Sequence, residues 1–253
     1  MINVVIIGAG NVAAHLYQNI TAADGLEVLQ VYNRTAEHLS FVKDLKKRCT
    51  RLEDLEKADL YLIAVKDEAI EEIAGILPDF GGLVAHTSGS QPLKTLSKFK
   101  NFGVFYPLQT FSKNKEINFR NVPLCLEANS AENLEFLKKA ASKLSDKVFE
   151  VNSEQRKALH LSAVFVNNFS NHMYALAAEY CKLNGLPFKI LQPLIKETAA
   201  KIETLPPYSA QTGPALRNDQ KTIHDHLEML EVDQKKIYTI LTQSIQKLHG
   251  KKL

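Results

Sequence analysis

The stretch Ile2–Ala13, with the sequence INVVIIGAGNVA, decides the fold of this chain. It begins with an apolar run rich in β-branched residues, which is typical of a buried strand, and then passes through a glycine turn into a helical pattern. Gly8 permits a tight turn, Gly10 lets a phosphate approach the backbone, and Ala13 lets the helix pack close to the strand. The stretch therefore predicts a dinucleotide site, because the free N–H groups of a helix start attract pyrophosphate. A glycine turn that binds no ligand is the alternative.

The rhythm of short apolar runs and helical patterns continues through the first half of the chain. Continuous apolar strands separated by helices predict a parallel sheet covered on both faces, which is the doubly wound α/β or Rossmann fold. We expect strands at Ile2–Ile7, Leu26–Tyr32, Leu60–Val65, Leu83–His86 and Gly103–Tyr106, edge strands at Pro123–Ala128 and Lys147–Val151, and helices at Ala36–Lys47, Glu68–Ile76 and Ala131–Leu144.

The second half of the chain is predicted to be all-helical. Ser153 is a candidate N-cap, although Arg156 stands where a complete capping box needs Glu or Gln. The domain boundary is expected near residue 152, which gives a Rossmann domain over 1–152 and a helical domain over 153–253. We expect helices from Glu154 to about Leu183, where Asn184-Gly185 is a C-cap signal, from Pro187 to about Thr204, from about Asp219, and a last one to about Leu248.

The end of the second strand indicates which dinucleotide is bound. An NAD site needs an acidic residue there, but the chain has Asn33-Arg34-Thr35. A guanidinium beside a hydroxyl suits the 2′-phosphate of NADP, so NADP is the expected cofactor. A solvated surface charge is the alternative for Arg34. The expected cofactor-binding residues are Gly8, Ala9, Gly10, Asn11, Val12, Asn33, Arg34, Thr35, Ala64 and Val65.

Composition and charge argue against nucleic-acid binding, a membrane partner and a metal site. The formal net charge is only +3, and no run of Lys and Arg is long enough to indicate nucleic-acid binding. The sequence has no apolar stretch of membrane-spanning length and no signal-peptide pattern, so no membrane partner is expected. Cys49, Cys125 and Cys181 match no metal-ligand spacing, and so sparse a set fits a reducing, cytoplasmic compartment.

Several motifs together resemble a known family. Three segments of the first half carry the first likeness, namely Gly8–Ala13, Asn33-Arg34-Thr35 and Ala64-Val65. They look like the NADP-binding half of pyrroline-5-carboxylate reductases and their relatives. Three further pieces are His86–Ser90, Tyr106–Phe111, and Thr212-Gly213-Pro214 with Arg217, Asp219, Thr222 and His226. Together, all these segments resemble a family of predicted NADP oxidoreductases built from a Rossmann-like domain and a short helical C-terminal domain of unknown function. The resemblance implies a helical domain like those of the 6-phosphogluconate dehydrogenase-like superfamily.

This resemblance implies an NADP site, and a helical domain that pairs subunits, but it names no substrate. The chain departs from the family pattern at two positions. The family usually has His where Tyr106 stands and Gly where Asn218 stands. If the family's His donates a proton, either Tyr106 replaces it or another residue has that role.

Five residues are candidates for the chemistry. His160 is a possible general acid on the long helix, and His86 and Ser88 lie in a polar segment at a strand end. The resemblance favours Asn168 as the counterpart of a recurring Asn, and Arg217 could hold a substrate anion. Each has a structural alternative: a histidine in a helix interface, a polar turn whose hydroxyls cap a helix, or an arginine that pairs with Asp219. On an α-helical period, Asn167 and Asn171 would share the face of His160.

Two functions are favoured on this evidence, and a different enzyme class on the same fold is a third possibility, because fold does not imply function. The first is an NADP(H)-dependent oxidoreductase that acts on a small polar carbonyl or imine compound held at the domain interface. The second is a non-catalytic NADP(H)-binding redox sensor or partner module, which the replacement at Tyr106 favours. In either case, the apolar helices of the C-terminal domain predict a homodimer, because a domain so short does not readily bury them alone.

Overall fold

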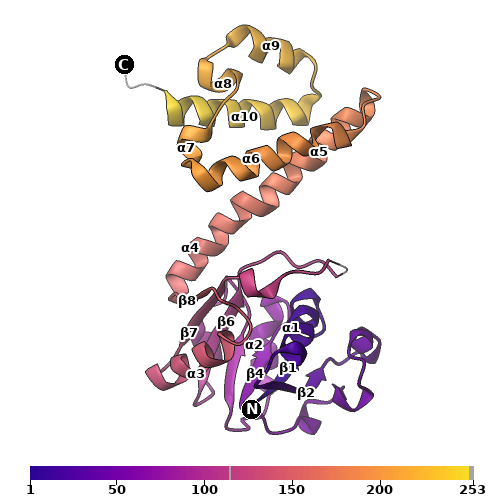
Figure 1. Ribbon diagram of the computed structural model, residues 1–253, viewed down its shortest axis with the longest axis vertical. Coiled ribbons are helices and arrows are strands. Elements are labelled where there is room, and N and C mark those ends of the chain that lie inside the picture. The colour runs from indigo at the N-terminus through magenta and orange to yellow at the C-terminus, as the bar shows by residue number, and fades with distance from the viewer. Residues whose placement is uncertain (114, 251–253) are drawn as a thin grey trace. The chain divides into compact units, whose positions relative to one another are not determined.

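The computed structural model describes residues 1–113 and 115–250 of the chain. It contains two compact units, the first spanning Met1–Asn168 and the second beginning at Phe169. The first unit holds the whole sheet, and the second is entirely helical. The predicted fold class, a Rossmann sheet followed by a helical region, is confirmed (Figure 1).

The sheet of the first unit has eight strands in the order β3-β2-β1-β4-β5-β6-β7-β8. Its first six positions repeat the strand order of dinucleotide-binding doubly wound folds. All neighbouring strands are parallel except β6 and β7, which are antiparallel. The strands are β1 (Ile2–Ile7), β2 (Leu26–Tyr32), β3 (Arg48–Cys49), β4 (Leu60–Ile63), β5 (Leu83–His86), β6 (Phe102–Pro107), β7 (Leu124–Ala128) and β8 (Val148–Glu150).

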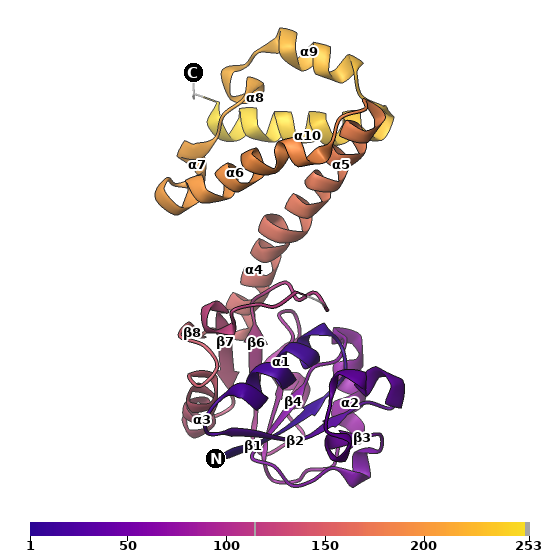
Figure 2. The same ribbon diagram turned by 45° about the vertical axis from the view of Figure 1, so that its right-hand side comes forward.

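Helices cover both faces of this sheet (Figures 1 and 2). Successive residues of a strand point to opposite faces, so Val4 and Ile6 of β1 join one apolar core, and Val5 and Ile7 join the other. The first core lies under α1 (Asn11–Ala22) and α3 (Ala131–Ala141), and the second lies under α2 (Ile70–Ile76). The sheet is therefore buried on both sides, as its continuous apolar strands predict.

The order of the strands locates the place where ligands bind in such folds. The chain leaves β1 toward β2 on one side and later returns to β4 on the other, so the strand order reverses between β1 and β4. Open α/β sheets bind ligands outside the carboxyl ends of the strands at this switch point. Gly8 follows β1 and Ala64 follows β4, so both lie at that edge.

Two local predictions were wrong. Residues 36–47 form short 3-10 turns, Ala36–Phe41 and Leu45–Lys47, and not a helix. The Asp44 side chain accepts from the backbone N–H of Lys46, a local bond that competes with helix formation. The N-cap of α4 (Ser153–Ala163) is Asn152 and not Ser153, and Gln155 completes its capping box.

The long helix predicted from Glu154 to Leu183 is continuous but not uniform. It consists of α4, a π-helical segment at Val164–Phe169, and α5 (Ser170–Leu183). A π segment bonds i to i+5 and so resets the phase of the faces. The projection that aligned Asn167 and Asn171 with His160 therefore does not hold across this segment.

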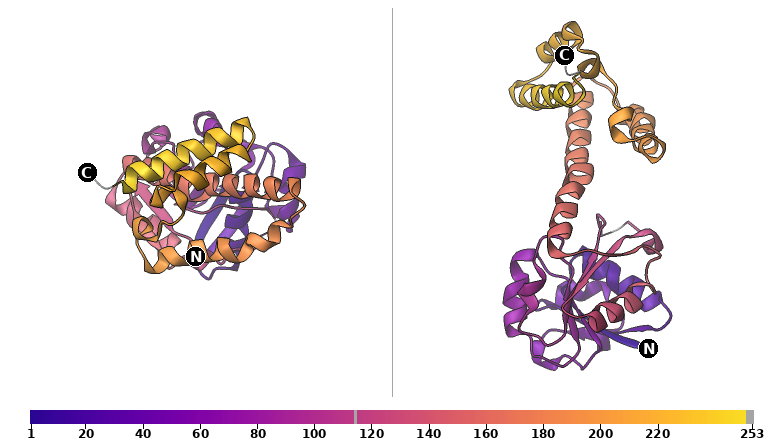
Figure 3. Two further views of the ribbon diagram at one scale, coloured as in Figure 1. Left: turned by 90° about the horizontal axis from the view of Figure 1, so that it is seen from above. Right: turned by 90° about the vertical axis from the view of Figure 1, so that its left-hand side faces the viewer.

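The second unit continues from α5 through three further helices that the sequence predicts, α6 (Gln192–Thr204), α9 (Gln220–Glu228) and α10 (Val232–His249). Two short helices that were not predicted, α7 (Pro207–Ala210) and α8 (Pro214–Arg217), lie between α6 and α9, and α8 packs against α10. Figure 3 shows the helices of this unit in orange and yellow. Among residues 169–250, only Ala215, Ile223 and Thr242 are buried. No helix in the described part of the chain is both long enough and apolar enough to cross a membrane.

Candidate active site at the carboxyl edge of the sheet

The glycine turn after β1 has the geometry that a dinucleotide needs. Gly8 has a φ of +126°, and a Cβ there would lie 2.2 Å from the carbonyl oxygen of Ala64. Its N–H donates to the Tyr32 carbonyl at 2.8 Å. Only glycine fits this position, and its absent side chain lets the ends of β1 and β4 approach one another.

The start of α1 offers room and polarity for a phosphate. A Cβ on Gly10 would meet no atom within 4 Å, so open space faces this backbone. The N-cap Gly10 gives no side-chain hydrogen bond, and the first turn of α1 carries no acidic residue. Its N–H groups and the positive end of its dipole suit an anion. These residues fit the pyrophosphate of a dinucleotide.

The loop after β2 is shaped by Asn33. The Asn33 N–H donates to the carbonyl of Cys49 at 3.1 Å, and its side-chain oxygen accepts from the N–H of Thr35 at 2.9 Å. This Asx turn holds Arg34 between two fixed neighbours, with the Arg34 side chain exposed. Arg34 and Thr35 thus lie at the end of β2, where an adenosine ribose is recognised in this fold.

The turn after β5 carries His86 and Ser88, and both are held internally. His86 has no exposed surface, its Nδ1 accepts from the Ser88 N–H at 3.2 Å, and its Nε2 has no hydrogen-bond partner. Burial, reinforced by the nearby Arg156 charge, lowers the pKa of His86 to about 4. The Ser88 hydroxyl accepts from the N–H groups of Ser90 and Gln91, at 3.1 and 3.0 Å. His86 is therefore neutral at pH 7 and shielded from solvent.

The adjacent Ser90 links this turn to the end of β4. Its hydroxyl donates to a carboxylate oxygen of Asp67, which follows β4 and is exposed. Burial is the larger influence on both rings: it lowers the pKa of His86 and raises the pKa of Tyr106. The Asp67 charge is a smaller influence and raises both pKa values. A carboxylate therefore lies at the same edge of the sheet as both rings.

Tyr106 and His160 form a pair beside this turn. The Tyr106 hydroxyl lies 3.2 Å from Nδ1 of His160, and the two rings meet edge to face. Burial raises the pKa of Tyr106 to about 12, so its phenol stays protonated at neutral pH. A Cβ on Gly89 would lie 2.7 Å from both His160 Nδ1 and Tyr106 Cζ, so this backbone passes directly against the pair. The pair and the turn form one packed cluster.

A buried ion pair lies beneath this cluster. Arg156, in the first turn of α4, has no exposed surface and pairs with the carboxylate of Glu127 on β7. The other guanidinium nitrogen donates to the Gln91 carbonyl and to the Ser153 hydroxyl. Glu127 also accepts from the N–H and the hydroxyl of Ser153. Arg156 therefore ties together the turn after β5, strand β7 and the start of α4.

Two further residues predicted to act in catalysis, Asn168 and Arg217, are both exposed. Asn168 is exposed in the π segment, where its side-chain oxygen lies 3.5 Å from the Asn167 amide nitrogen. Arg217 belongs to the second unit and is exposed at the end of α8. Asn218, where the resemblance implies Gly, has a φ of 56° and caps α8 in the left-handed region. Asn is one of the few residues besides Gly that adopt this conformation readily.

Sequence reasoning did not assign a role to Asp67, Glu127 or Arg156. The Lys66-Asp67 step after an apolar strand was a usable signal for Asp67, because strand ends meet at this edge. The only unusual feature of Arg156 in the sequence is its place in the first turn of a predicted helix, where the helix dipole disfavours a cation. Its partner Glu127 is 29 residues distant in the chain, so no local pattern links the two.

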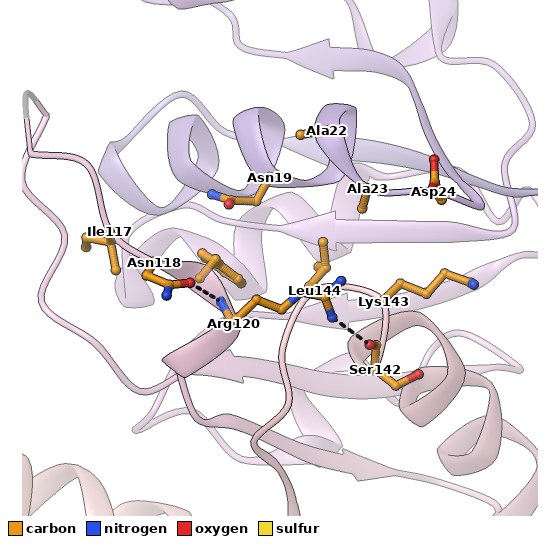
Figure 4. Close-up of a pocket in the computed structure, with 11 residues that line it drawn as sticks. Asn19, Ala22, Ala23, Asp24, Ile117, Asn118, Arg120, Ser142, Lys143 and Leu144 are labelled. Carbon is orange, nitrogen blue, oxygen red and sulfur yellow. Dashed lines mark hydrogen bonds between the residues drawn. The ribbon is translucent and has the colours of Figure 1, made fainter.

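A separate cavity of about 540 Å³ lies on the face covered by α1 and α3 (Figure 4). It lies between the end of α1, the segment 117–120 and the end of α3, and includes Asn19, Arg120 and Lys143. Two helices end here, and the carbonyl groups of the last turn of α3 already accept hydrogen bonds from the residues that follow it. None of the residues predicted to bind the cofactor or to act in catalysis lines it.

Two family models match the chain. A model described as NADP oxidoreductase coenzyme F420-dependent matches residues 3–82, and the model of a domain of unknown function (DUF2520) matches residues 122–245. Together they cover the glycine turn, the turn after β2 and the segment from β7 through most of α10. No curated protein matches the chain.

Solved structures extend this comparison. The crystal structure of "putative NADP oxidoreductase BF3122 from Bacteroides fragilis" is 42% identical, with 97% of this chain and 98% of that chain covered and a TM-score of 0.89. The imine reductase from Myxococcus stipitatus in complex with NADP+ is 17% identical, with 98% and 96% covered and a TM-score of 0.66. The pyrroline-5-carboxylate reductase from Streptococcus pyogenes is 14% identical, with 98% of each chain covered and a TM-score of 0.66.

The last two likenesses show the fold alone, whereas the identity to the Bacteroides fragilis protein extends over nearly the whole of both chains. The resemblance drawn from the sequence motifs is therefore confirmed. The chain belongs to the NADP oxidoreductase family that combines a Rossmann-like domain with a helical C-terminal domain of unknown function.

Proposed function

We propose that this protein is an NADPH-dependent reductase of a small polar carbonyl or imine compound. The observation that carries the proposal is the Tyr106–His160 pair, packed against the turn after β5 at the edge of the sheet where Gly8 and Gly10 lie. Bound NADPH would supply the hydride. The protein must then supply a proton to the oxygen or nitrogen of the substrate, and must hold the substrate in place.

His160 is the proposed proton donor. The Tyr106 phenol, with a pKa of about 12, holds its proton too tightly to be the primary acid, so the imidazole that contacts it is the candidate. In the neutral resting ring, the Tyr106 hydroxyl donates to Nδ1 and the proton lies on Nε2. The donating form is the imidazolium, because a neutral ring that lost its proton would become imidazolate. In the imidazolium, Nδ1–H donates to the Tyr106 oxygen and Nε2–H is the proton that would pass to the substrate, which leaves a neutral ring. Tyr106 thus takes a positioning role at the position where the family usually has His.

The other predicted residues receive narrower roles. His86, neutral and buried, shapes the turn through its bond to the Ser88 N–H, which is a positioning role and not that of an acid. Ser88 remains a proposed orienting group, although its hydroxyl also lies 3.4 Å from the Ser90 hydroxyl, whose own proton is donated to Asp67. Asn168 and Arg217 remain proposed orienting groups, and Arg217 suits a carboxylate or phosphate on the substrate.

NADPH rather than NADH is the proposed reductant because of Arg34 and Thr35. A guanidinium hydrogen bond to a phosphate contributes about 1.5–3 kcal/mol, or about tenfold to a hundredfold in affinity. Thermal unfolding with NADPH, with NADH and without ligand tests this preference. A ligand at about 100 times its Kd adds about 2.7 kcal/mol, which raises the Tm of a chain this size by several degrees. The Arg34→Ala variant should lose about half or more of the NADPH shift.

Arg51→Ala is the matched control for that variant, because Arg51 is equally exposed but bonds to Glu53 at 2.7 Å. It should keep the NADPH shift of the wild type. Equal shifts with NADPH and NADH in the wild type would refute the preference for NADP but leave the dinucleotide site intact. No shift with either would refute the cofactor proposal as a whole.

A non-catalytic NADP(H)-binding module is the second candidate function, favoured by Tyr106 in place of the family's His. Oxidation of NADPH can be followed over a panel of aldehydes, 2-keto acids and cyclic imines. Turnover that is lost in His160→Ala while NADPH still raises the Tm would support the reductase. NADPH binding without turnover of any compound would favour the non-catalytic module.

We also propose a homodimer formed through the second unit. Its helices leave many large apolar side chains exposed, more than a stable monomer normally presents to water. Light scattering should give twice the 28.3 kDa mass of one chain, and a monomer mass would refute the proposal. The exposed residues include Tyr174, Leu183, Leu186, Ile190, Leu194, Ile202, Leu205, Tyr208, Leu216, Met229, Val232, Ile240, Leu241 and Leu248.

A further inference from the structure

Arg156 occupies a place that stability alone does not explain. A buried charge is costly to desolvate, and replacing a buried ion pair by apolar residues often stabilises a protein. Arg156 has no exposed surface, its Nε has no hydrogen-bond partner, and it lies in the first turn of α4, where the helix dipole disfavours a cation. Because Arg156 is buried despite these energetic costs, we look for a role other than stabilisation of the fold.

The geometry of α4 and of the strands beside it indicates that role. Val104 is opposite Glu127, and Tyr106 is opposite Cys125, in the antiparallel β6–β7 ladder, so these side chains share one face of the sheet. Leu159 of α4 packs against the cluster of Val104, Tyr106 and Cys125. Arg156 contacts Glu127, and His160 contacts Tyr106. Helix α4 therefore meets this face at two successive levels.

The spacing of these levels matches in the two elements. Four residues of α-helix, from Arg156 to His160, rise about 6 Å. Two residues of strand, from Val104 to Tyr106, rise about 6.6 Å. The contact between Arg156 and Glu127 therefore fixes the position of α4 along strand β6. This places His160, one helical turn after Arg156, beside Tyr106.

Arg156 also fixes the third member of the cluster. Its guanidinium donates to the Gln91 carbonyl, which ends the turn containing Gly89. The same turn passes against His160 and Tyr106 so closely that a single added methyl group at Gly89 would collide with both. A planar guanidinium can hold Glu127 and Gln91 together, which the single nitrogen of a lysine cannot do in the same way.

We propose that Arg156, through its buried pair with Glu127, is the positioning residue that aligns His160 with Tyr106 and with the turn after β5. The inference rests on the proposed function of His160 as proton donor. The arrangement itself can be measured without a substrate, so its failure and the failure of the reductase proposal are distinguishable. Absence of turnover would count only against the reductase.

The test is NMR of the full chain with ¹⁵N-labelled histidine, which reports the ratio of the two neutral tautomers of His160. A His160→Gln variant identifies the signal among the eight histidines. The main variant is Arg156→Met combined with Glu127→Gln, because it removes both charges and leaves an amide oxygen for Ser153. The loss of the bond between His160 and Tyr106 should change the ratio about threefold or more.

Arg120→Met is the matched control, because the exposed Arg120 bonds to Asp146 at 3.4 Å away from the cluster. It should leave the His160 signal unchanged. An unchanged tautomer ratio in a folded double variant would overturn the proposal and leave Arg156 a merely structural residue. If circular dichroism shows that the double variant does not fold, Arg156→Lys decides in the same way. A changed His160 ratio in that variant supports the proposal, and an unchanged ratio overturns it.

Discussion

The hydroxyl of Tyr106 lies 3.2 Å from Nδ1 of His160, and this contact joins strand β6 to helix α4 across 54 residues of sequence. The phenol is almost completely buried, and its pKa is raised to about 12, so it remains a protonated donor over the whole physiological range. A fixed donor on one ring nitrogen determines which nitrogen carries the proton. The pair thereby gives the His160 imidazole a defined orientation.

Tyr106→Phe should weaken this orientation without unfolding the protein. The loss of one hydrogen bond lowers the free energy of unfolding by about 1 kcal/mol. The tautomer ratio of His160 should change, and kcat should fall more than KM rises, because substrate binding is left in place. Histidine NMR and steady-state kinetics check the two effects.

Tyr61→Phe is the control for that variant, since the buried Tyr61 hydroxyl donates to Glu56 and accepts from Ala58, each at 2.8 Å. It should lose stability but leave His160 unchanged. Identical His160 spectra in Tyr106→Phe and the wild type would contradict the proposed pairing.

Gly89→Ala should separate the two rings. The new methyl group would lie 2.7 Å from His160 Nδ1 and from Tyr106 Cζ, closer than real Cβ contacts allow. Overpacking of this kind costs about 1–3 kcal/mol, so we expect a lower Tm and a changed His160 signal. Gly75→Ala is the control, because a Cβ there meets no atom within 4 Å and Gly75 lies inside α2. It should be neutral or stabilising by about 0.5–1 kcal/mol. If Gly89→Ala and Gly75→Ala gave the same Tm and the same His160 signal, the turn at Gly89 would not be in tight contact with Tyr106 and His160.

Gly10→Ala should separate cofactor binding from folding. A Cβ at Gly10 enters open space, so the variant should fold with a Tm near that of the wild type. The same methyl group would occupy the path of the pyrophosphate, and the affinity for NADPH should fall about tenfold or more, which is about 1.4 kcal/mol. Gly8→Ala should instead destabilise the fold, because its φ is +126° and its Cβ would clash with Ala64. Calorimetric titration with NADPH makes the comparison, and undiminished affinity in Gly10→Ala would argue against pyrophosphate at this turn.

His86 should make the stability of the first unit depend on pH. Its pKa falls from 6.5 in the unfolded chain to about 4 in the folded protein, so the unfolded state binds more protons between these values. The free energy of unfolding therefore rises with pH through this window and is reduced at pH 4, by an amount on the order of 3 kcal/mol.

Chemical denaturation at pH 4.5 and pH 7 measures this dependence. His86→Asn, which keeps an acceptor for the Ser88 N–H, should flatten it, and His38→Asn, at an exposed position, should not. An unchanged slope in His86→Asn would show that another group titrates in this window.

Much of the first unit could be predicted from the sequence, because its determinants are local. Strands buried on both faces must be continuously apolar, so their positions were confirmed to within a few residues. Gly8 was recognised because a tight turn between a strand and a helix requires glycine, and its φ of +126° agrees with that reason. The helix ends at Leu183 and Thr204 were confirmed for the same kind of reason, since Asn184-Gly185 and Pro206-Pro207 stop helices by backbone geometry.

The cluster around His160 could be predicted only in part. His160, His86 and Ser88 were candidates because polar side chains of this chemistry are uncommon in an apolar context, but Tyr106, the partner of His160, lies 54 residues away in the chain. The π segment at Val164–Phe169 has no clear sequence signal, and it shifts the helix faces beyond it. Glu127 and Arg156 carry no motif, and their importance follows from burial, which depends on the packing of α4 against β6 and β7.

The sequence by itself determined the strand–turn–helix unit at Ile2–Ala13, the doubly wound sheet and the family, because short-range sterics and hydrophobic periodicity specify them. Only the tertiary structure decided that Tyr106 contacts His160, that Arg156 supports both, and that His86 is too deeply buried to be charged at pH 7. The physical reason is that hydrogen bonding and pKa depend on which groups are brought together and on how much water is excluded. Neither property is encoded in the neighbours of a residue along the chain.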